Sequence, residues 1–221
     1  MRRVMLLHQR YRTEAMRLGP VGYWRLGEST GTVARDETEA NNGTYVGSPT
    51  LGAAGALAGD PNTASTLNGT SQYATLASAV LVGNVFSVCA WAKLDVLGTD
   101  RCIFNAGRSE GPSMMIDGTG HLVIDRSAIA RVFTSTPTVA AGAWHFYGVT
   151  KNGATSALYI DGAAVAFTGA DQTFSNATGV GHIGSDGGFQ PFIGTLDEPA
   201  IWNRALTAQE IARLYSVGRG F

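Results

Sequence analysis

Residues 144–167, WHFYGVTKNGATSALYIDGAAVAF, contain three short runs of apolar and β-branched residues separated by two tight-turn sequences. The turns are Asn152-Gly153 and Asp161-Gly162, whose residues tolerate the positive φ angles that two-residue hairpin turns require. The stretch therefore predicts an antiparallel meander. Its strands are expected over residues 144–149, 157–160 and 163–167.

Strand runs joined by glycine-containing turns extend over most of the chain. Residues 114–116 and 121–124 predict a second hairpin around Asp117-Gly118-Thr119-Gly120. Glycine accounts for 29 of the 221 residues, about twice the usual share of roughly 7%. This glycine content suits many tight turns, so we expect an all-β fold in which antiparallel strands dominate.

The N-terminal segment predicts a helix. Apolar residues recur there three or four positions apart, and Gly19-Pro20 stops the pattern because proline cannot continue a helical hydrogen-bond ladder. The recurring residues are Val4, Leu7, Tyr11, Ala15 and Leu18. We therefore divide the chain into a helical arm over residues 1–20 and one β domain over residues 21–221.

A second short helix is predicted close to the C-terminus. Thr207 and Glu210 have the spacing of a capping box, in which each side chain bonds the backbone N–H of the other residue. Leu206 and Ile211 flank it at hydrophobic staple positions. We expect a helix over 208–216, closed by Gly218.

Composition excludes several classes of function. Sixteen basic and 17 acidic residues give a net charge of -1, so there is no overall basic field for binding nucleic acid. No window approaches the roughly 18 apolar residues of a membrane span, and the apolar run 4–7 is too short for an export signal. Cys89 and Cys102 are too few for a disulfide scaffold; we expect two free, packed thiols, and their pairing across neighbouring strands stays open.

Seven short motifs follow one another along the body of the chain. They are GYWRLGE (22–28), DETEANNG (36–43), STLNGTSQY (65–73), FSVCAWAK (86–93), WHF (144–146), LYIDG (158–162) and FIGTLDE (192–198), which leads into IWNRAL (201–206). In this order they resemble the laminin-G-like, concanavalin A-like jelly-roll family. The resemblance implies a two-sheet antiparallel sandwich that is usually a binding or structural module. The leading phrase GPVGYWRLGE, preceded by a short helix, also resembles the form of this domain in bacteriophages of actinobacteria.

Calcium is the one cofactor that the sequence suggests. It prefers six to eight oxygen ligands, and the loop 36–43 offers carboxylate, amide and backbone oxygens. The resemblance implies a site that this loop shares with the terminal Asp-Glu pair, so Asp36, Asn42 and Asp197 are the candidate ligands. The alternative is structural: Asp36 caps its own turn, and Asp197 satisfies buried backbone.

Glycan recognition needs an exposed aromatic ring beside amide and carboxylate groups. The loop 185–190 has this composition, which makes Asp186, Phe189 and Gln190 candidate glycan ligands, although an ordinary turn has the same composition. The four tryptophans lie in the family motifs within strands and are expected in the core. They are Trp24, Trp91, Trp144 and Trp202.

No catalytic site emerges from the sequence. Residues 107–111 fit the G-x-S-x-G pattern but lie between two strand-like runs, and 179–184 fit a dinucleotide fingerprint without a helix to follow. No glutamates or aspartates have the strand spacing of a glycosidase pair, and the histidines lack metal spacing. We therefore expect no enzymatic activity and no catalytic residues.

Two functions remain. The first is a structural virion protein, a capsid decoration or minor capsid or tail protein, that docks to the phage particle through an apolar stripe on the N-terminal helix. The docking residues would be Val4, Leu7, Tyr11 and Leu18. The alternative is a calcium-assisted lectin that attaches to host-surface glycan. The expected location is the surface of the virion, and a homo-oligomer stays open. The alternative for the N-terminal arm is that it packs against the β domain of the same chain.

Overall fold

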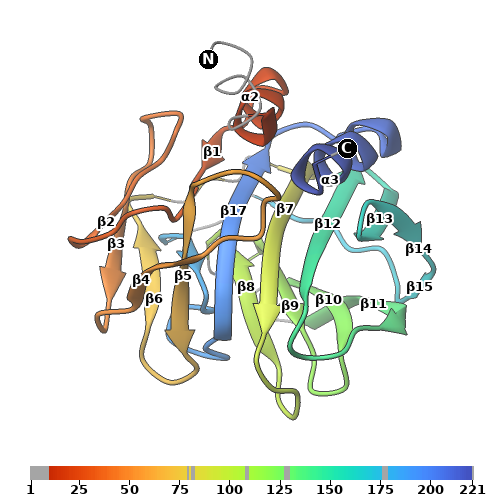
Figure 1. The fold of residues 1–221 in the computed structure, drawn as a ribbon. Coiled ribbons are helices and arrows are strands. Elements are labelled where there is room, and N and C mark those ends of the chain that lie inside the picture. The colour runs from red at the N-terminus through yellow and green to blue at the C-terminus, as the bar shows by residue number, and fades with distance from the viewer. Residues whose placement is uncertain are drawn as a thin grey trace.

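The computed structural model describes residues 10–220, except 79, 81–82, 108–109, 127–129 and 176–178. Two antiparallel sheets face each other, and two short helices lie together at one side of the pair (Figure 1). The all-β, two-sheet sandwich that the sequence predicts is therefore confirmed. The predicted N-terminal helix begins at Arg10 among the described residues, and Val4 and Leu7 lie outside them.

The first sheet, here the covered sheet, has eight strands in the order β14-β13-β12-β7-β17-β5-β4, and β1 pairs with β17. All of its pairings are antiparallel. Its strands are β1 (Gly22–Tyr23), β4 (Thr50–Ala54), β5 (Thr63–Asn68), β7 (Val85–Leu94), β12 (Trp144–Asn152), β13 (Thr155–Ile160), β14 (Ala163–Val165) and β17 (Ile193–Trp202).

The second sheet, here the open sheet, has nine strands in the order β15-β11-β10-β9-β8-β16-β6-β3-β2. Its pairings are also antiparallel. Its strands are β2 (Val33–Ala34), β3 (Gly43–Val46), β6 (Tyr73–Leu76), β8 (Arg101–Asn105), β9 (Pro112–Ile116), β10 (His121–Arg126), β11 (Ala130–Thr138), β15 (Phe167–Thr168) and β16 (His182–Ile183).

Strand β7 shows how the sequence alternation builds two apolar layers. Phe86, Val88 and Ala90 belong to the core between the two sheets. Cys89 and Trp91 belong to a second cluster on the outer face of the covered sheet. Successive side chains of a strand point to opposite faces, so a strand that is apolar at every position needs cover on both sides. The helices supply that cover.

Helices α2 (Arg10–Arg17) and α3 (Ala208–Gly218) lie on this outer face. Thr207 caps α3 with the reciprocal bonds of a capping box, as predicted. The helix runs two residues past the expected end at 216, and Gly218 lies within it instead of closing it. A Cβ atom at Gly218 would come within 2.7 Å of the Trp91 ring, so close packing explains this glycine.

The predicted hairpins are confirmed, and β12 and β9 are longer than expected, since β12 continues to Asn152 and β9 begins at Pro112. The strand predicted over 163–167 is wrong at its end: β14 stops at Val165, and Phe167 begins β15, which pairs with β11 in the other sheet. Both cysteines are free and buried. Trp24, Trp91 and Trp202 are fully buried, but Trp144 is only partly buried and lies under the Lys93 ammonium. The prediction that the tryptophans lie in the core is therefore confirmed for three of them, whereas Trp144, at the start of β12, packs at the edge of the second cluster and is only partly buried.

Candidate functional site

A rigid hairpin connects β16 to β17 and carries the predicted glycan ligands. The backbone N–H of Asp186 donates to the carbonyl of Phe189 at 2.9 Å, and the N–H of Phe189 donates back at 3.1 Å. Gly187 and Gly188 make the turn with φ of 62° and 93°, values that suit glycine. The Ser185 hydroxyl accepts from the N–H of Gly188 at 2.7 Å and so braces the turn.

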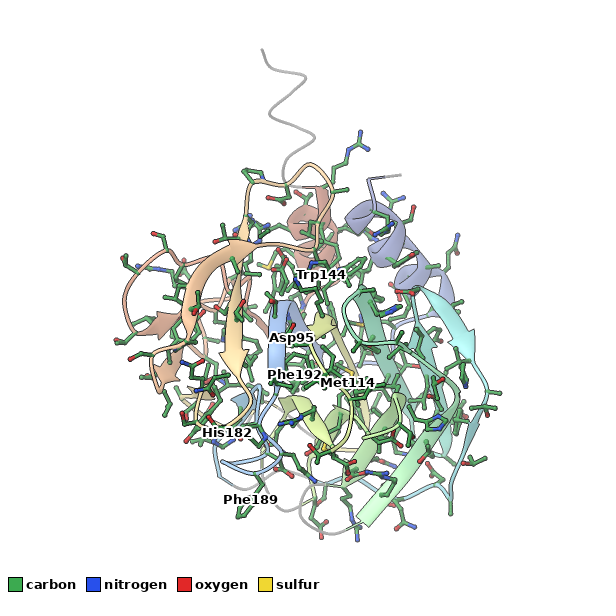
Figure 2. The ribbon with its side chains drawn as sticks, turned by 60° about the horizontal axis from the view of Figure 1, so that its bottom comes forward. Asp95, Met114, Trp144, His182, Phe189 and Phe192 are labelled. Atoms are coloured by element: carbon green, nitrogen blue, oxygen red, sulfur yellow. The ribbon has the colours of Figure 1, made fainter. Side chains whose placement is uncertain are left out.

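This hairpin places Phe189 in solvent. Its exposed fraction is 60%, and among the described residues it is the one aromatic side chain in the set of large, exposed apolar groups. Figure 2 shows Phe189 at the periphery of the molecule, beyond the end of the sheets. Backbone hydrogen bonds in both directions between Asp186 and Phe189 fix the turn, so the position of the exposed ring is set by an ordered turn.

The polar neighbours of Phe189 are fixed by the open sheet. The buried Asp186 carboxylate accepts from the Asn105 amide at 2.9 Å, and the same amide nitrogen lies 2.7 Å from the Ser113 hydroxyl. Gln190 is partly buried, and its carbonyl accepts from the N–H of Cys102 at 2.9 Å. Two of the three predicted glycan residues are thus anchored to β8, and the third is exposed.

The open sheet carries charged groups on β10 and β11 and in the loops beside them. The Arg131 guanidinium reaches Asp125 at 3.3 Å, Asp100 at 2.5 Å and Asp117 at 3.8 Å. Burial raises the pKa of Asp125, and Arg131 opposes the rise. Asp186 adds to the same rise, so the two carboxylates are electrostatically coupled. The Phe189 hairpin therefore adjoins a polar, charged face.

A second polar site lies at the start of β5. Sequence reasoning names the adjacent Asp197 as a calcium ligand but offers no role for Arg25, Asp60 or Glu198. Glu198 accepts from Arg25 Nε at 2.9 Å and from the Tyr23 hydroxyl, and Arg25 Nη2 donates to Asp60 at 2.9 Å. Arg25 and Asp60 line a hollow of about 370 Å³ with Gly27, Ser29, Pro61, Asn62 and Thr63. We call this hollow the Arg25 hollow.

Glu198 occupies a strained position in β17. The pairing of β17 with β7 shifts register between Asp197 and Ala200, and Glu198 has φ of 54°. Such bulges and left-handed residues are frequent at functional sites. Burial raises the pKa of Glu198 to about 7, and its bonds to Arg25 and Tyr23 limit the rise. Two adjacent carboxylates in an apolar strand were the signal in the sequence.

The predicted calcium ligands are engaged in other bonds. The Asp36 carboxylate accepts backbone N–H bonds from Tyr23 at 2.9 Å, from Thr38 at 3.0 Å and from Asn41 at 2.9 Å. Asn42 accepts from the N–H of Asp36. Across the described residues, no group of three or more histidine, cysteine, aspartate or glutamate side chains could hold a metal ion.

Asp197 is engaged separately from Asp36, since its carboxylate accepts from the N–H of Ala56 at 2.8 Å. The structural alternative for Asp36 therefore fits the observed bonds: its oxygens are used to hold its own loop and β1. Calcium binding stays a prediction.

The described part of the N-terminal helix turns Tyr11 and Leu18 toward its own sheet and not toward a partner. Tyr11 and Leu18 are 2% and 4% exposed, and both pack in the cluster beneath α2 and α3. Glu14 is ion-paired with Arg213 of α3 at 2.9 Å. The outer face of β7, β12 and β17 is apolar and needs this cover, which is why the stripe folds inward. Docking through Tyr11 and Leu18 is therefore wrong, while Val4 and Leu7 lie outside the described residues.

Two facing antiparallel sheets define a jelly-roll sandwich. The chain belongs to the concanavalin A-like lectin/glucanases superfamily, whose laminin-G-type model matches residues 68–212. The family named from the seven sequence motifs is thus confirmed. No curated protein matches the sequence.

Solved structures share the fold. Domain 4 of AbnA, an extracellular arabinanase from Geobacillus stearothermophilus solved with arabinotriose, has a TM-score of 0.71 at 21% identity, covering 89% of this chain and 98% of that one. A Trypanosoma rangeli sialidase has a TM-score of 0.66 at 17% identity, covering 90% of this chain but 32% of the sialidase chain. This chain therefore spans about a third of the sialidase.

These likenesses correct the prediction that the chain is not an enzyme. Both similar structures come from proteins named as enzymes, an arabinanase and a sialidase. A sandwich of this kind is therefore found in enzymes, and missing sequence motifs do not exclude catalysis. At these identities the likeness shows the fold alone, so it assigns no activity either. Separately, no helix in the described part of the chain is long and apolar enough to cross a membrane.

Proposed function

We propose that this chain is a carbohydrate-binding module that holds a glycan against the Phe189 hairpin. The observation that carries the proposal is a solvent-exposed aromatic ring on a turn braced by Ser185 and by paired backbone bonds. A preformed platform loses little conformational entropy when a ligand binds. The aromatic face carries partial negative charge, which suits the C–H groups of a sugar ring.

Polar groups beside the ring would bind the sugar hydroxyls. Gln190 is partly accessible and follows Phe189 directly, so its amide can donate and accept. Asp186 is fixed by Asn105 at the base of the same turn. An aromatic platform with a few fixed polar groups is the usual composition of a small-ligand site. The similar arabinanase domain, solved with arabinotriose, supports this class of ligand.

The test is a glycan array followed by calorimetry on the strongest hit, with arabinotriose included. We expect Phe189→Ala to weaken binding at least tenfold, or about 1.4 kcal/mol. Val96→Ala is the matched control, because Val96 is also exposed, at 48%, but lies in the loop after β7. Equal affinity of the Phe189 variant and the wild type, or no glycan bound by the wild type, would contradict the proposal.

A role on a phage virion stays a separate proposal, supported by the resemblance of the leading residues 19–28 to actinobacteriophage proteins. The structure changes how it is tested. Removing residues 1–19 would uncover the apolar cluster under α2, so a loss of particle association would be ambiguous. Removing residues 1–9 leaves α2 in place. Cosedimentation with purified particles that is unchanged by this deletion would remove the N-terminal segment as an anchor.

A further inference from the structure

The Arg25 hollow belongs to a longer polar trough along one edge of the sandwich. An adjoining hollow of about 330 Å³ shares Arg25, Gly27, Ser29 and Asn62 with it. Another of about 330 Å³ shares Ser29 and continues between the loops 29–32 and 47–51. Volumes of this size fall in the range of small-ligand sites.

The floor of the trough is rigid. Arg25 is held by two carboxylates, Asp60 and Glu198, and its side chain is 12% exposed. Asn62 donates to the carbonyl of Arg25 at 3.2 Å and to that of Thr63 at 2.9 Å. These bonds join the segment after β1, the loop before β5 and strand β17. Because the groups are already fixed by one another, a ligand would not have to order them on binding.

Several hydrogen-bonding groups that line the hollow are not used by its floor, and they suit the hydroxyl groups of a ligand. Among the bonds of the described residues, Arg25 uses Nε and Nη2, which leaves the two N–H donors of Nη1. Asn62 donates through its amide nitrogen, and its Oδ1, which accepts no bond from the described residues, lies against Gly27 at the wall of the hollow. Ser29 adds an exposed hydroxyl. One hydroxyl of a vicinal diol can accept from Arg25 while its neighbour donates to Asn62 or Asp60.

The surrounding charges select the ligand class. Arg25 is ion-paired with Asp60 and Glu198, and Glu37 of the neighbouring hollow is ion-paired with Arg12. Glu28 and Arg35 also line that hollow, so four carboxylates lie near the trough with three guanidinium groups. A phosphate or an acidic sugar would therefore meet more carboxylates than free cations. A neutral, hydroxyl-rich ligand meets no such penalty.

We propose that the Arg25 hollow is a second carbohydrate subsite, one that binds a neutral sugar unit through a vicinal diol. This inference rests on the proposed function, because it assigns a further subsite of the same ligand class. The two subsites are separated along β5. Thr63 lines the hollow at the start of this strand, whereas Gly69, just after its end, donates to the carbonyl of Phe192 beside the Phe189 hairpin. Five strand steps span about 17 Å.

Two subsites at this separation allow one glycan chain, or two branches on a surface, to be held at once. The second contact is then intramolecular, which raises apparent affinity for a dense glycan surface without raising the affinity of either subsite. Loss of one subsite should therefore lower the apparent affinity for an immobilised polysaccharide, while the affinity of the remaining subsite for a soluble trisaccharide should not change.

Ser29→Trp is the variant that tests the second subsite. Ser29 is exposed, lines all three hollows and takes no part in the ion pairs of the floor, so an indole there fills the trough while leaving its support intact. Thr155→Trp is the matched control, because Thr155 is exposed at the start of β13, a strand next to the opposite edge of the covered sheet.

The experiment uses the strongest neutral oligosaccharide from the array, with calorimetric stoichiometry and hydrogen exchange as readouts. For the wild type we expect two bound molecules per chain, with added protection over residues 60–63 and 185–190. Ser29→Trp should reduce the stoichiometry to one and remove only the first protected segment. Its binding to the densely immobilised glycan should weaken about tenfold or more. Thr155→Trp should match the wild type.

The outcomes separate this inference from the proposed function. One bound molecule, with protection over 185–190 alone and no effect of Ser29→Trp, overturns the second subsite and leaves the module standing. No glycan bound by the wild type overturns both. Protection over 60–63 that is lost in Ser29→Trp but kept in Phe189→Ala supports the second subsite even if the hairpin is not a platform.

Discussion

The outer faces of the two sheets are built from the same kind of strand but differ in what covers them. On the covered sheet, α2 and α3 bury Trp91, Phe146 and Trp202 completely. On the open sheet, charged groups such as Arg131 and Asp125 pair with each other, and the adjacent hairpin holds Phe189 in solvent. Aromatic residues therefore stabilise the fold on one face, whereas beyond the other face one aromatic ring is exposed.

The largest expected effect tests the covered face. Trp91 is fully buried, stacks on Tyr215 of α3 with ring centroids 5.6 Å apart and contacts Phe146 of β12 at 5.4 Å. Trp91→Ala should lower the free energy of unfolding by about 3–5 kcal/mol, because it leaves a large cavity under the helix. Urea denaturation measures the change.

Trp144→Ala is the matched control for this variant, because Trp144 is only partly buried in the same sheet. Its loss should cost less than half as much. If both variants unfold at the same urea concentration, Trp91 contributes no more to stability than a partly buried tryptophan, and α3 does not stabilise the covered face through it.

The next effect is pH dependence from Glu198. Its carboxyl is buried in the folded chain and has a pKa of about 7, against an ordinary value of 4.5. The folded state therefore binds this proton more tightly. This tighter proton binding stabilises the folded state fully below about pH 4.5. The stabilisation is lost as the pH rises through 7, which lowers the free energy of unfolding by about 3 kcal/mol. Urea denaturation at pH 5 and at pH 8 should show this fall.

Glu198→Gln removes the titrating group and should flatten the profile between those two pH values. Some slope should persist, because burial also raises the pKa of Asp197. A wild-type chain that is more stable at pH 8 than at pH 5 would show that the Arg25 ion pair outweighs burial at this position.

A smaller effect is expected at the start of α3. The Thr207 side chain accepts from the N–H of Glu210, and the Arg204 guanidinium is the main cause that lowers the pKa of Glu210 to about 2. Thr207→Ala should cost about 1 kcal/mol, because it leaves an N–H at the helix end without a partner. Thr155→Ala, at an exposed strand position, is the control for loss of a threonine. Equal stabilities of the two variants would contradict a role for the cap.

The features that the sequence could predict are local. The meander needs only neighbouring turn residues, and the α3 cap needs only residues 206–211. The Arg25–Glu198 pair joins positions 173 residues apart and could not be predicted without the sheet order. For the same reason the apolar spacing over residues 4–18 does not distinguish an external partner from the chain's own sheet: it shows that a face is buried, but not which surface buries it.

The smallest expected effect on stability is also the one that separates a platform from a core residue. Phe189 is 60% exposed, so Phe189→Ala should change the free energy of unfolding by no more than about 0.5 kcal/mol. The same variant should lose glycan affinity at least tenfold. Trp91→Ala should show the reverse pattern. Its free energy of unfolding should fall, while the molecules that stay folded should bind glycan with unchanged affinity. If Phe189→Ala instead destabilises the chain as much as loss of a buried aromatic residue would, the ring stabilises the open sheet. Aromatic residues would then serve stability on both sheets, contrary to the proposal.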